Sequence, residues 1–340
     1  MTSDQMRIRS ARAGASVTIT DVAQLAGVSE STVSRVLREK GASSEKVRRR
    51  VRDAVETLGY VPNRLAGTLA SAGSNLVGVV IASLGNVVFP DLLRGVSTAL
   101  DAAGYQPVIG VTDYDVDREE KLVAAMLAWR PAALIVTGLD HSPRTSAMLR
   151  GAGIRIAEVL DVDGEGIDIV VGYSNRAAGE MSAMLLLRRG HRRIGYVGHD
   201  VSHDHRAEKR RDSFRTTLAR EGLPLVAETI MPSSSSIESG RDGLALLLAA
   251  HPDLDAVYFS NDDMALGGLF HCRSHGIGIP GDLAVMGYNG LDITRLAPQP
   301  LTTILTPRTR VGEVAAQLLF AGGPAETVDL GFELIEGATV

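Results

Sequence analysis

Hydrophobic residues along the chain follow two different periods. Before residue 62 they recur every three to four positions, as on one face of short helices. Beyond Ser74, short continuous apolar runs alternate with stretches of helical period. The apolar runs predict buried parallel strands at residues 76–82, 107–112, 132–137, 155–159, 167–172, 193–198, 256–260 and 283–287. The helical stretches between most of them are residues 90–103, 118–129, 176–189, 208–221, 239–250 and 263–275.

The strand–helix alternation predicts the architecture of the larger part of the chain. Repeated strand–helix–strand units indicate doubly wound α/β domains with parallel sheets, which bind ligands at the carboxyl ends of their strands. About 265 residues with this pattern suit two such lobes. A cleft between lobes is a usual place for a small molecule.

Two short helices are expected on either side of Gly27. Thr18, with Asp21 three positions later, is a capping-box start for the first helix, and Ser29 is expected to cap the second, at residues 30–38. Gly27 permits the left-handed backbone of a tight turn. Their buried faces are expected to hold Val22, Ala23, Leu25, Val33, Val36 and Leu37. Such a small all-α pair is the helix-turn-helix arrangement, whose second helix enters the major groove of DNA.

A third helix is expected between Ser44 and Gly59, and its polar face is basic. Taken alone, such a run is more often a solvated surface than a nucleic-acid contact, and a pair of short helices is a common hairpin. The distribution of charge favours DNA. Residues 1–72 hold 12 Lys and Arg against 7 Asp and Glu, whereas the remaining residues hold 23 basic and 33 acidic side chains. A basic head on an acidic body draws only the head toward phosphates.

Further features concern the compartment. Residues 1–16 are basic and rich in small residues with no apolar run behind them, which predicts a disordered arm and not a signal peptide. No apolar run approaches the ~18 residues of a membrane helix. The single cysteine, Cys272, fits a reducing compartment. We therefore expect a cytoplasmic, nucleoid-associated protein without a membrane partner.

The segments TITDVAQLAGVSESTVSRVL and LGYVPNRLAGTLAS resemble the head and hinge of the lactose/galactose repressor family. The resemblance implies a DNA-binding domain at residues 17–62 and a hinge helix and linker at 63–74. Leu69 matches the leucine that family members wedge into the minor groove, whereas Ala70 departs from members with a basic residue there. Arg35 suits guanine, which accepts a bidentate guanidinium. The residues implied to contact DNA are Thr18, Ser29, Glu30, Ser31, Thr32, Ser34, Arg35, Asn63, Ala66 and Leu69.

The resemblance continues through VGVVIASLGNVVF, RRGHRRIGYVG, FSNDDMALGG, GIPGDLAVMGYNG and PLTTILTPR, to about residue 334. It implies that residues 75–340 form a two-lobed, periplasmic-binding-protein-like domain for effector binding and dimerisation. Arg210, four residues before Phe214, occupies the family's cationic sugar-binding position, and a guanidinium can clamp a carboxylate. The implied effector-binding residues are Ser83, Asn86, Phe89, Thr137, His141, His199, Arg210, Asn261 and Asn289.

Within the family the chain is most similar to gluconate-utilisation repressors, through HSPRT, VVGYSN, SSSS, LTPR and DLGFEL. Asn289 and Ser174 stand where the family often has aspartate. Loss of a carboxylate at Asn289 reduces the repulsion of an anion, which favours a sugar acid over a neutral sugar. The resemblance implies that gluconate or a related acid releases the protein from DNA, and that no cofactor takes part.

Oligomeric state follows from the size of the head. One such module buries only ~600–1,000 Å² on DNA, so tight binding implies a homodimer on a palindromic operator. No heptad zipper follows residue 334, which favours a dimer over a tetramer.

Four weaker signals have ordinary structural explanations. Residues 276–281 match G-x-G-x-x-G, but they follow a helix and precede a strand, the reverse of a dinucleotide turn. Asp262 and Asp263 cap a helix more readily than they form a catalytic pair. Trp129 and Met126 share a helical stripe typical of core packing. A possible metal cluster matches no zinc spacing and consists of His199, Asp200, His203, Asp204 and His205.

Three hypotheses follow, with a ligand-controlled repressor favoured and no enzymatic activity expected. A solute-binding protein of sugar uptake has the same two-lobed body, but the head and the missing signal peptide argue against it. A nicotinamide-dependent enzyme would need a correctly placed glycine-rich turn with an acidic residue ~20 positions on, which is lacking.

Overall fold

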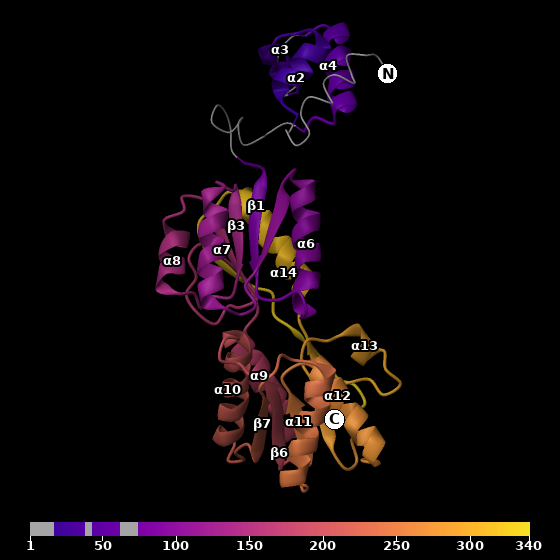
Figure 1. Cartoon of the computed structure of the whole chain (residues 1–340). Coiled ribbons are helices and arrows are strands. Elements are labelled where there is room, and N and C mark those ends of the chain that lie inside the picture. The colour runs from indigo at the N-terminus through magenta and orange to yellow at the C-terminus, as the bar shows by residue number, and fades with distance from the viewer. Residues whose placement is uncertain (1–16, 38–42, 62–73) are drawn as a thin grey trace. The chain divides into compact units, whose positions relative to one another are not determined.

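The described part of the N-terminal head contains three helices: α2 (Ile19–Ala26), α3 (Glu30–Leu37) and α4 (Glu45–Leu58) (Figure 1). Thr18 forms the expected capping box with Asp21. The Thr32 N–H donates to Ser29 Oγ over 3.3 Å at the start of α3, and the same arrangement with Ser44 begins α4. Each cap satisfies an N–H that the first helical turn leaves unpaired. The predicted helices are confirmed, with α3 ending at Leu37.

The head helices share a small apolar core. Its fully buried members are Val22, Ala23, Ala26, Val33, Val51 and Ala54. The prediction that Leu25 is buried is wrong, because its side chain is 38% exposed. At 100° per residue, Leu25 lies about 100° around α2 from the centre of the face formed by Val22, Ala23 and Ala26.

The computed structural model describes residues 17–37, 43–61 and 74–340. The chain divides into two compact units, Met1–Ser74 and Asn75–Val340. The expected arm at residues 1–16 and most of the expected hinge, residues 63–73, lie outside the described residues, as do Asn63, Ala66, Leu69 and Ala70.

The second unit contains two parallel sheets, each the centre of one lobe. In lobe 1 the order is β11-β5-β4-β3-β1-β2, with every neighbouring pair parallel. The strands are β1 (Leu76–Ile81), β2 (Gln106–Val111), β3 (Ala133–Thr137), β4 (Arg155–Val159), β5 (Ile169–Gly172) and β11 (Glu326–Asp329). The reversal of strand order between β1 and β3 is the switch point at which doubly wound sheets bind ligands.

Helices cover both faces of the lobe 1 sheet (Figure 1). They are α6 (Val88–Ala102), α7 (Val116–Ala128), α8 (Pro143–Arg150) and α14 (Arg308–Ala321). Val79 packs in the core that includes α6 and α14, whereas its neighbour Val80 packs with Val123 of α7 and Leu149 of α8. Because successive strand residues face opposite sides, the continuous apolar runs bury both faces of the sheet.

Lobe 2 repeats this plan on a smaller sheet of order β7-β6-β8-β9. The strands are β6 (Ile194–His199), β7 (Ala227–Met231), β8 (Ala256–Phe259) and β9 (Ala284–Met286). The covering helices are α9 (Asn175–Arg188), α10 (His205–Arg220), α11 (Ile237–Ala250) and α12 (Asp262–His275). Tyr258 packs against Phe214 of α10, whereas Val257 lies in the core formed with α11 and α12. The predicted α/β two-lobed class is confirmed.

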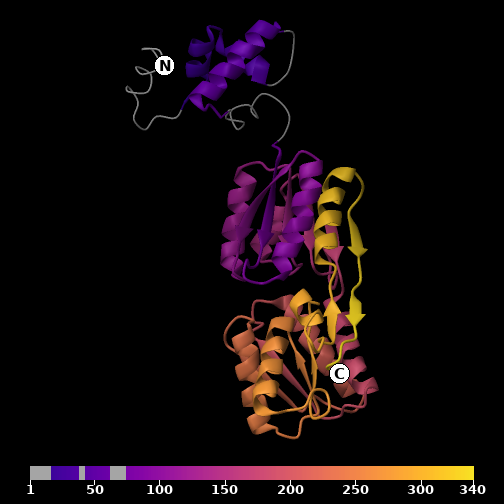
Figure 2. The same cartoon turned by 90° about the vertical axis from the view of Figure 1, so that its right-hand side faces the viewer.

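The C-terminal part of the chain runs back and forth between the lobes (Figure 2). After α13 (Asp292–Arg295) and β10 (Thr303–Leu305) it enters α14 and β11 of lobe 1 and then returns through β12 (Glu333–Ile335). β10 and β12 pair antiparallel. Sequence periodicity did not predict β7, α8 or these late elements. Strands β7 and β11 have no continuous apolar run, because their side chains are exposed or half-buried.

Two observations bear on the surface of the body. Met126 is buried as expected, but the prediction of core packing for Trp129 is wrong, because its side chain is 50% exposed just beyond α7. In the described parts of the chain, no helix is long and apolar enough to cross a lipid bilayer.

Candidate functional site

The turn between α2 and α3 is held by one arginine of the basic run on α4. Gly27 has φ 62°, and the Arg50 guanidinium donates from Nε to the Ala26 carbonyl (2.8 Å) and from Nη2 to the Gly27 carbonyl (2.8 Å). These carbonyls belong to the C-terminal end of α2, where a positive charge is favourable. Arg50 therefore fixes the angle between the two helices and is occupied in doing so.

The start of α3 presents a polar surface. Glu30, Ser31 and Arg35 are exposed, and the structure holds Glu30 through a 2.7 Å hydrogen bond donated by Thr20 Oγ1. Ser29 Oγ lies 2.9 Å from Ser31 Oγ and 2.8 Å from the hydroxyl of Thr32. Among the other expected DNA contacts, Thr18 and Ser34 are half-buried. An exposed helix face bearing a guanidinium, a carboxylate and hydroxyls is suited to reading base edges.

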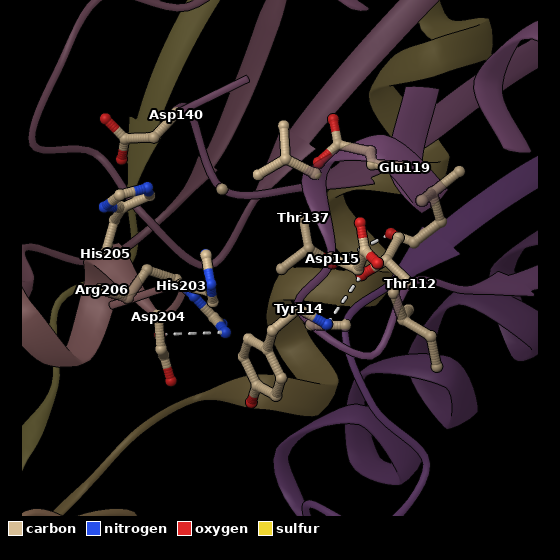
Figure 3. A pocket seen from close by; sticks show the side chains of 15 residues that line it. Thr112, Tyr114, Asp115, Glu119, Thr137, Asp140, His203, Asp204, His205 and Arg206 are labelled. Carbon is tan, nitrogen blue, oxygen red and sulfur yellow. Dashed lines mark hydrogen bonds and ion pairs between the residues drawn. The ribbon is translucent and has the colours of Figure 1, made fainter. Parts of the chain in front are cut away.

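The second candidate site is a pocket between the two lobes (Figure 3). One wall follows the carboxyl ends of β1, β2 and β3, and the opposite wall is the start of α10. Its empty volume is about 560 Å³, part of which is open to solvent. The polar residues that line it are Thr112, Tyr114, Asp115, Glu119, Thr137, Asp140, His203, Asp204, His205 and Arg206.

A turn of unusual backbone shapes the lobe 1 wall. Asp113 and Tyr114 have φ 52° and 61°, the left-handed region that non-glycine residues rarely adopt. The turn directs the Tyr114 ring into the pocket, where Asn86 Nδ2 donates to its hydroxyl over 3.3 Å. Burial, with a smaller effect of Asp204, raises the pKa of Tyr114 to about 12, so the phenol stays neutral. Asp115 then caps α7 by accepting from two backbone N–H groups.

The lobe 2 wall carries the positive charge. Arg206 lies with its guanidinium carbon 5.5 Å from the centre of the Phe89 ring and its Nη2 3.6 Å from Asp204. His199 Nε2 is 3.6 Å from the same carboxylate. Burial would raise the pKa of Asp204, but Arg206 and His199 outweigh it and hold the pKa well below its usual range. Asp204 therefore stays ionised and positions the guanidinium at the pocket.

A lysine joins the lobes beside the pocket. Lys209 of α10 pairs with Asp140 of lobe 1 at 2.8 Å and with Asp161, which follows β4, at 2.6 Å. Asp161 is fully buried, whereas the Asp140 side chain is 42% exposed. Burial would lower the pKa of Lys209, but the two carboxylates raise it above its usual value.

The residues expected to bind an effector fall into two groups. Thr137 lines the pocket, and Asn86 and Phe89 contact its lining residues Tyr114 and Arg206. Ser83 lies in the loop after β1 and accepts from the Gly85 N–H. The expected residues that pack behind the lining, and are not part of it, are His141, His199, Arg210, Asn261 and Asn289.

Arg210 illustrates the second group. Its guanidinium is stacked 3.8 Å from the centre of the Tyr288 ring and donates to Asn175 Oδ1 at 3.0 Å and to the Ser260 carbonyl at 3.4 Å. A Cβ on Gly179 of α9 would lie 2.2 Å from the Arg210 carbonyl oxygen, so glycine permits the close approach of the two helices. Arg210 is thus held rigidly, one helical turn behind Arg206.

Several pocket residues were not predicted: Tyr114, Asp115, Glu119, Asp140 and Arg206. The expected helix at residues 208–221 begins in fact at His205, which places Arg206 in its first turn. Likewise α7 begins at Val116 and not at residue 118. Their position after the carboxyl ends of parallel strands was the signal that could have identified the lobe 1 residues among them.

The described residues include no group of three histidine, cysteine or carboxylate side chains arranged to hold a metal ion. In the stretch from His199 to His205, His199 is directed at Asp204 and Ser260, and His205 pairs with Glu208. These contacts account for His199, Asp204 and His205, three of the five side chains that the sequence suggested as metal ligands.

Comparison with known proteins decides the family. Residues 18–63 match the profile of bacterial regulatory proteins of the lacI family, and residues 74–326 match that of periplasmic binding proteins and the sugar binding domain of the LacI family. The chain belongs to the LacI family. It is a DNA-binding transcriptional regulator with a helix-turn-helix head, which confirms the expectation that it is not an enzyme.

Individual relatives agree over nearly the whole chain. The HTH-type transcriptional regulator GntR of Escherichia coli is 35% identical over 325 residues, which are 94% of this chain and 97% of that protein. A LacI-family regulator from Silicibacter pomeroyi superposes with a TM-score of 0.91 at 40% identity, covering 95% of this chain and 99% of that one. The lac repressor dimer bound to operator and the anti-inducer ONPF superposes with a TM-score of 0.80 at 25% identity, covering 96% of this chain and 99% of that one.

Proposed function

We propose that this LacI-family regulator represses genes of sugar-acid catabolism and is released from its operator by a sugar acid such as gluconate. The observation that carries the proposal is the pocket between the lobes, in which Arg206 stands beside His203 and His205 on one wall. A guanidinium recognises a carboxylate through paired, charge-assisted hydrogen bonds. The relatives named GntR and the gluconate-type segments of the sequence support the same effector class.

The residues behind the pocket support an anionic ligand as well. Arg210 adds a second buried positive charge one turn from Arg206. Asn289, in place of the aspartate common in the family, is buried and donates to Asn261 over 3.0 Å. The Oδ1 atom of Asn289 is buried with no hydrogen-bond partner in the described chain. We propose that Arg210, Asn261 and Asn289 complete the effector site when the lobes close on a ligand.

The DNA-binding residues form the second half of the proposal. Glu30, Ser31 and Arg35 would reach base edges from α3, where Thr32 lies beside them. Thr18, Ser29, Ser34 and Asn63 would hold phosphates, and Ala66 and Leu69 would extend the contact through the hinge. Arg50 is assigned to the turn and not to DNA, because Ala26 and Gly27 already occupy its guanidinium.

A homodimer on a palindromic operator is the proposed assembly. The lac repressor with which the chain superposes is a dimer bound to operator. In this chain β2 is the last strand of the lobe 1 sheet, and its large apolar side chain Ile109 is 47% exposed. Phe270 of α12 is 51% exposed on lobe 2. Burial of such side chains against a second copy is favourable at about 25 cal/mol per Å².

Control of DNA binding would follow from the two walls of the pocket. An effector that touches both lobes favours the lobe orientation in which both contacts exist, and only such differential affinity shifts the equilibrium. The Lys209–Asp140 pair already joins the lobes at this point. The regulator would act on the chromosome in the cytoplasm.

Thermal-shift measurements with a panel of sugar acids and neutral sugars test the effector class. A ligand at 100 times its Kd adds about 2.7 kcal/mol to the native state, which raises the unfolding midpoint. We expect D-gluconate or a related acid to raise it and glucose to leave it unchanged. The matched variant Arg206→Ala should lose the shift, whereas Arg215→Ala on the exposed side of α10 should keep it. A shift with neutral sugars alone would contradict the proposal.

A further inference from the structure

One carboxylate of the pocket, that of Glu119, is held in place by a buried histidine and a second buried carboxylate. Glu119 of α7 lines the pocket, and its side chain is 15% exposed. Its Oε1 lies 2.5 Å from Nδ1 of His141, and the other ring nitrogen of His141 is 3.5 Å from Glu158 of β4. His141 and Glu158 are each only 1% exposed, so neither can touch a ligand.

The three side chains come from separate parts of lobe 1. Glu158 also accepts a hydrogen bond from the Ile167 N–H, which fixes it from its far side. Burial would lower the pKa of His141, but the neighbouring carboxylates of Glu119 and Glu158 outweigh it and raise the pKa to about 9. A buried imidazolium between two carboxylates holds both in one geometry, because an unpaired buried charge is costly.

The other carboxylates of the pocket already have partners. Asp140 pairs with Lys209, Asp204 pairs with Arg206, and Asp115 caps α7. Glu119 has its buried partner at Oε1, and its Oε2 has no hydrogen-bond donor among the described residues. Figure 3 shows it on the wall formed by lobe 1, whereas Arg206 belongs to the wall formed by α10. The pocket therefore has an acidic side and a basic side.

We propose that Glu119 accepts a hydrogen bond from a hydroxyl group of the effector, while the effector's carboxylate faces Arg206. His141 and Glu158 are positioning residues that hold the Glu119 carboxylate toward the pocket. The proposal rests on the proposed sugar-acid function and adds to it the orientation of the ligand. A polyhydroxy acid has both groups, a carboxylate at one end and hydroxyl donors along the chain, and so matches both walls.

Isothermal titration with D-gluconate tests the assignment on the full-length protein. Glu119→Gln keeps the shape but removes the charged acceptor, and we expect affinity to fall about 10- to 100-fold, the usual worth of a hydrogen bond to a charged group. The matched control is Glu120→Gln, one residue along α7, because Glu120 pairs with Arg144 and Ser142 and does not line the pocket. Its affinity should stay within about twofold of wild type.

The positioning role has its own readout. Gluconate should shift the imidazolium ¹⁵N resonances of His141 in the wild type, and the shift should vanish in Glu119→Gln. If Glu119→Gln does not fold, Glu119→Asp, which keeps the charge but withdraws the carboxylate, should weaken binding instead. Wild-type affinity in Glu119→Gln, or an unchanged His141 resonance on binding, overturns the Glu119 assignment alone. Absence of binding by wild type to gluconate and to every other sugar acid overturns the effector class, and with it this assignment.

Discussion

The exposed polar surface of α3 and the pocket between the lobes position their polar groups in opposite ways. On α3, Glu30 and Ser31 are exposed, and short local hydrogen bonds with Thr20 and Ser29 hold them. In the pocket, pairs between distant segments hold the side chains, as for Lys209 with Asp140 and His141 with Glu119, and Asp204 and His141 are buried. Exposed side chains can change conformation when the partner binds. A buried network fixes its geometry before the ligand arrives.

The largest effect is expected from a charge placed in the core of the head, which should remove DNA binding and leave the pocket intact. Val33 is fully buried, and Val33→Asp would bury a carboxylate with no partner, at a cost of several kcal/mol. A head with so small a core cannot absorb that loss. We expect operator binding to be lost in a gel-shift assay, while the thermal shift caused by a sugar acid persists.

Leu25→Asp is the matched control for that change. Leu25 is 38% exposed on α2, so the same aspartate should leave the head folded, as followed by circular dichroism and calorimetry. Equal unfolding by both substitutions would contradict the assignment of the core.

The next largest effect concerns the lysine between the lobes. Lys209→Met leaves Asp161 fully buried without its cation, which costs about 3 kcal/mol. Asp140→Asn removes the more exposed partner of the same lysine and should cost less than about 1 kcal/mol. Chemical denaturation monitored by fluorescence measures both. Equal losses would show that burial does not distinguish the two pairs.

The His141 network makes the stability of the body depend on pH. The pKa of His141 is raised from 6.5 to about 9 in the folded chain. Between these values the folded chain holds a proton that the unfolded chain has lost, so stability falls as the pH rises through this window. The change is about 3 kcal/mol at 1.36 kcal/mol per pKa unit. Unfolding free energies measured from pH 6 to 10 should show this slope in wild type, and His141→Gln should lack it.

The smallest effect lies in the turn of the head. Arg50→Ala removes the donors that satisfy the Ala26 and Gly27 carbonyls, and we expect a loss of about 1–2 kcal/mol. Arg49→Ala, on the exposed face of the same helix, should change the head transition by less than about 0.5 kcal/mol. Calorimetry of the full chain resolves this transition. If Arg49→Ala destabilised the head as much, Arg50 would have no special role in the turn.

The sequence predicts the head better than the pocket, because the head is held by local contacts and the pocket by contacts between distant segments. Caps such as Thr18 and Ser29 act within three residues, so the three head helices and their turn were predictable from spacing. Leu25 was misplaced because an apolar residue near a helical stripe can still lie beyond its edge. In the body, apolar periodicity predicted the strands of both sheets except β7 and the late strands.

The pocket was harder to predict, because it depends on contacts between distant segments. The resemblance drew attention to Arg210 and His141, yet both are packed behind the lining. Arg206 lines it because α10 begins at His205, earlier than periodicity indicated, whereas Glu119 lies inside an expected helix whose wall of the pocket forms only in the folded chain. The left-handed turn at Asp113 and Tyr114 has no glycine to mark it. Pairs such as His141 with Glu158 join residues whose proximity only the folded sheet creates.

The central claim is that the pocket between the lobes controls DNA binding by the head. Operator affinity measured with and without effector tests it most directly. Fluorescence anisotropy of a labelled palindromic operator, titrated with full-length protein at fixed salt, gives the Kd in each state. Salt must be constant because phosphate contacts make the affinity strongly salt-dependent. We predict that D-gluconate or a related sugar acid weakens operator binding at least tenfold, and that Arg206→Ala binds operator normally but no longer responds. An operator affinity unchanged by a sugar acid that demonstrably occupies the pocket would contradict the account.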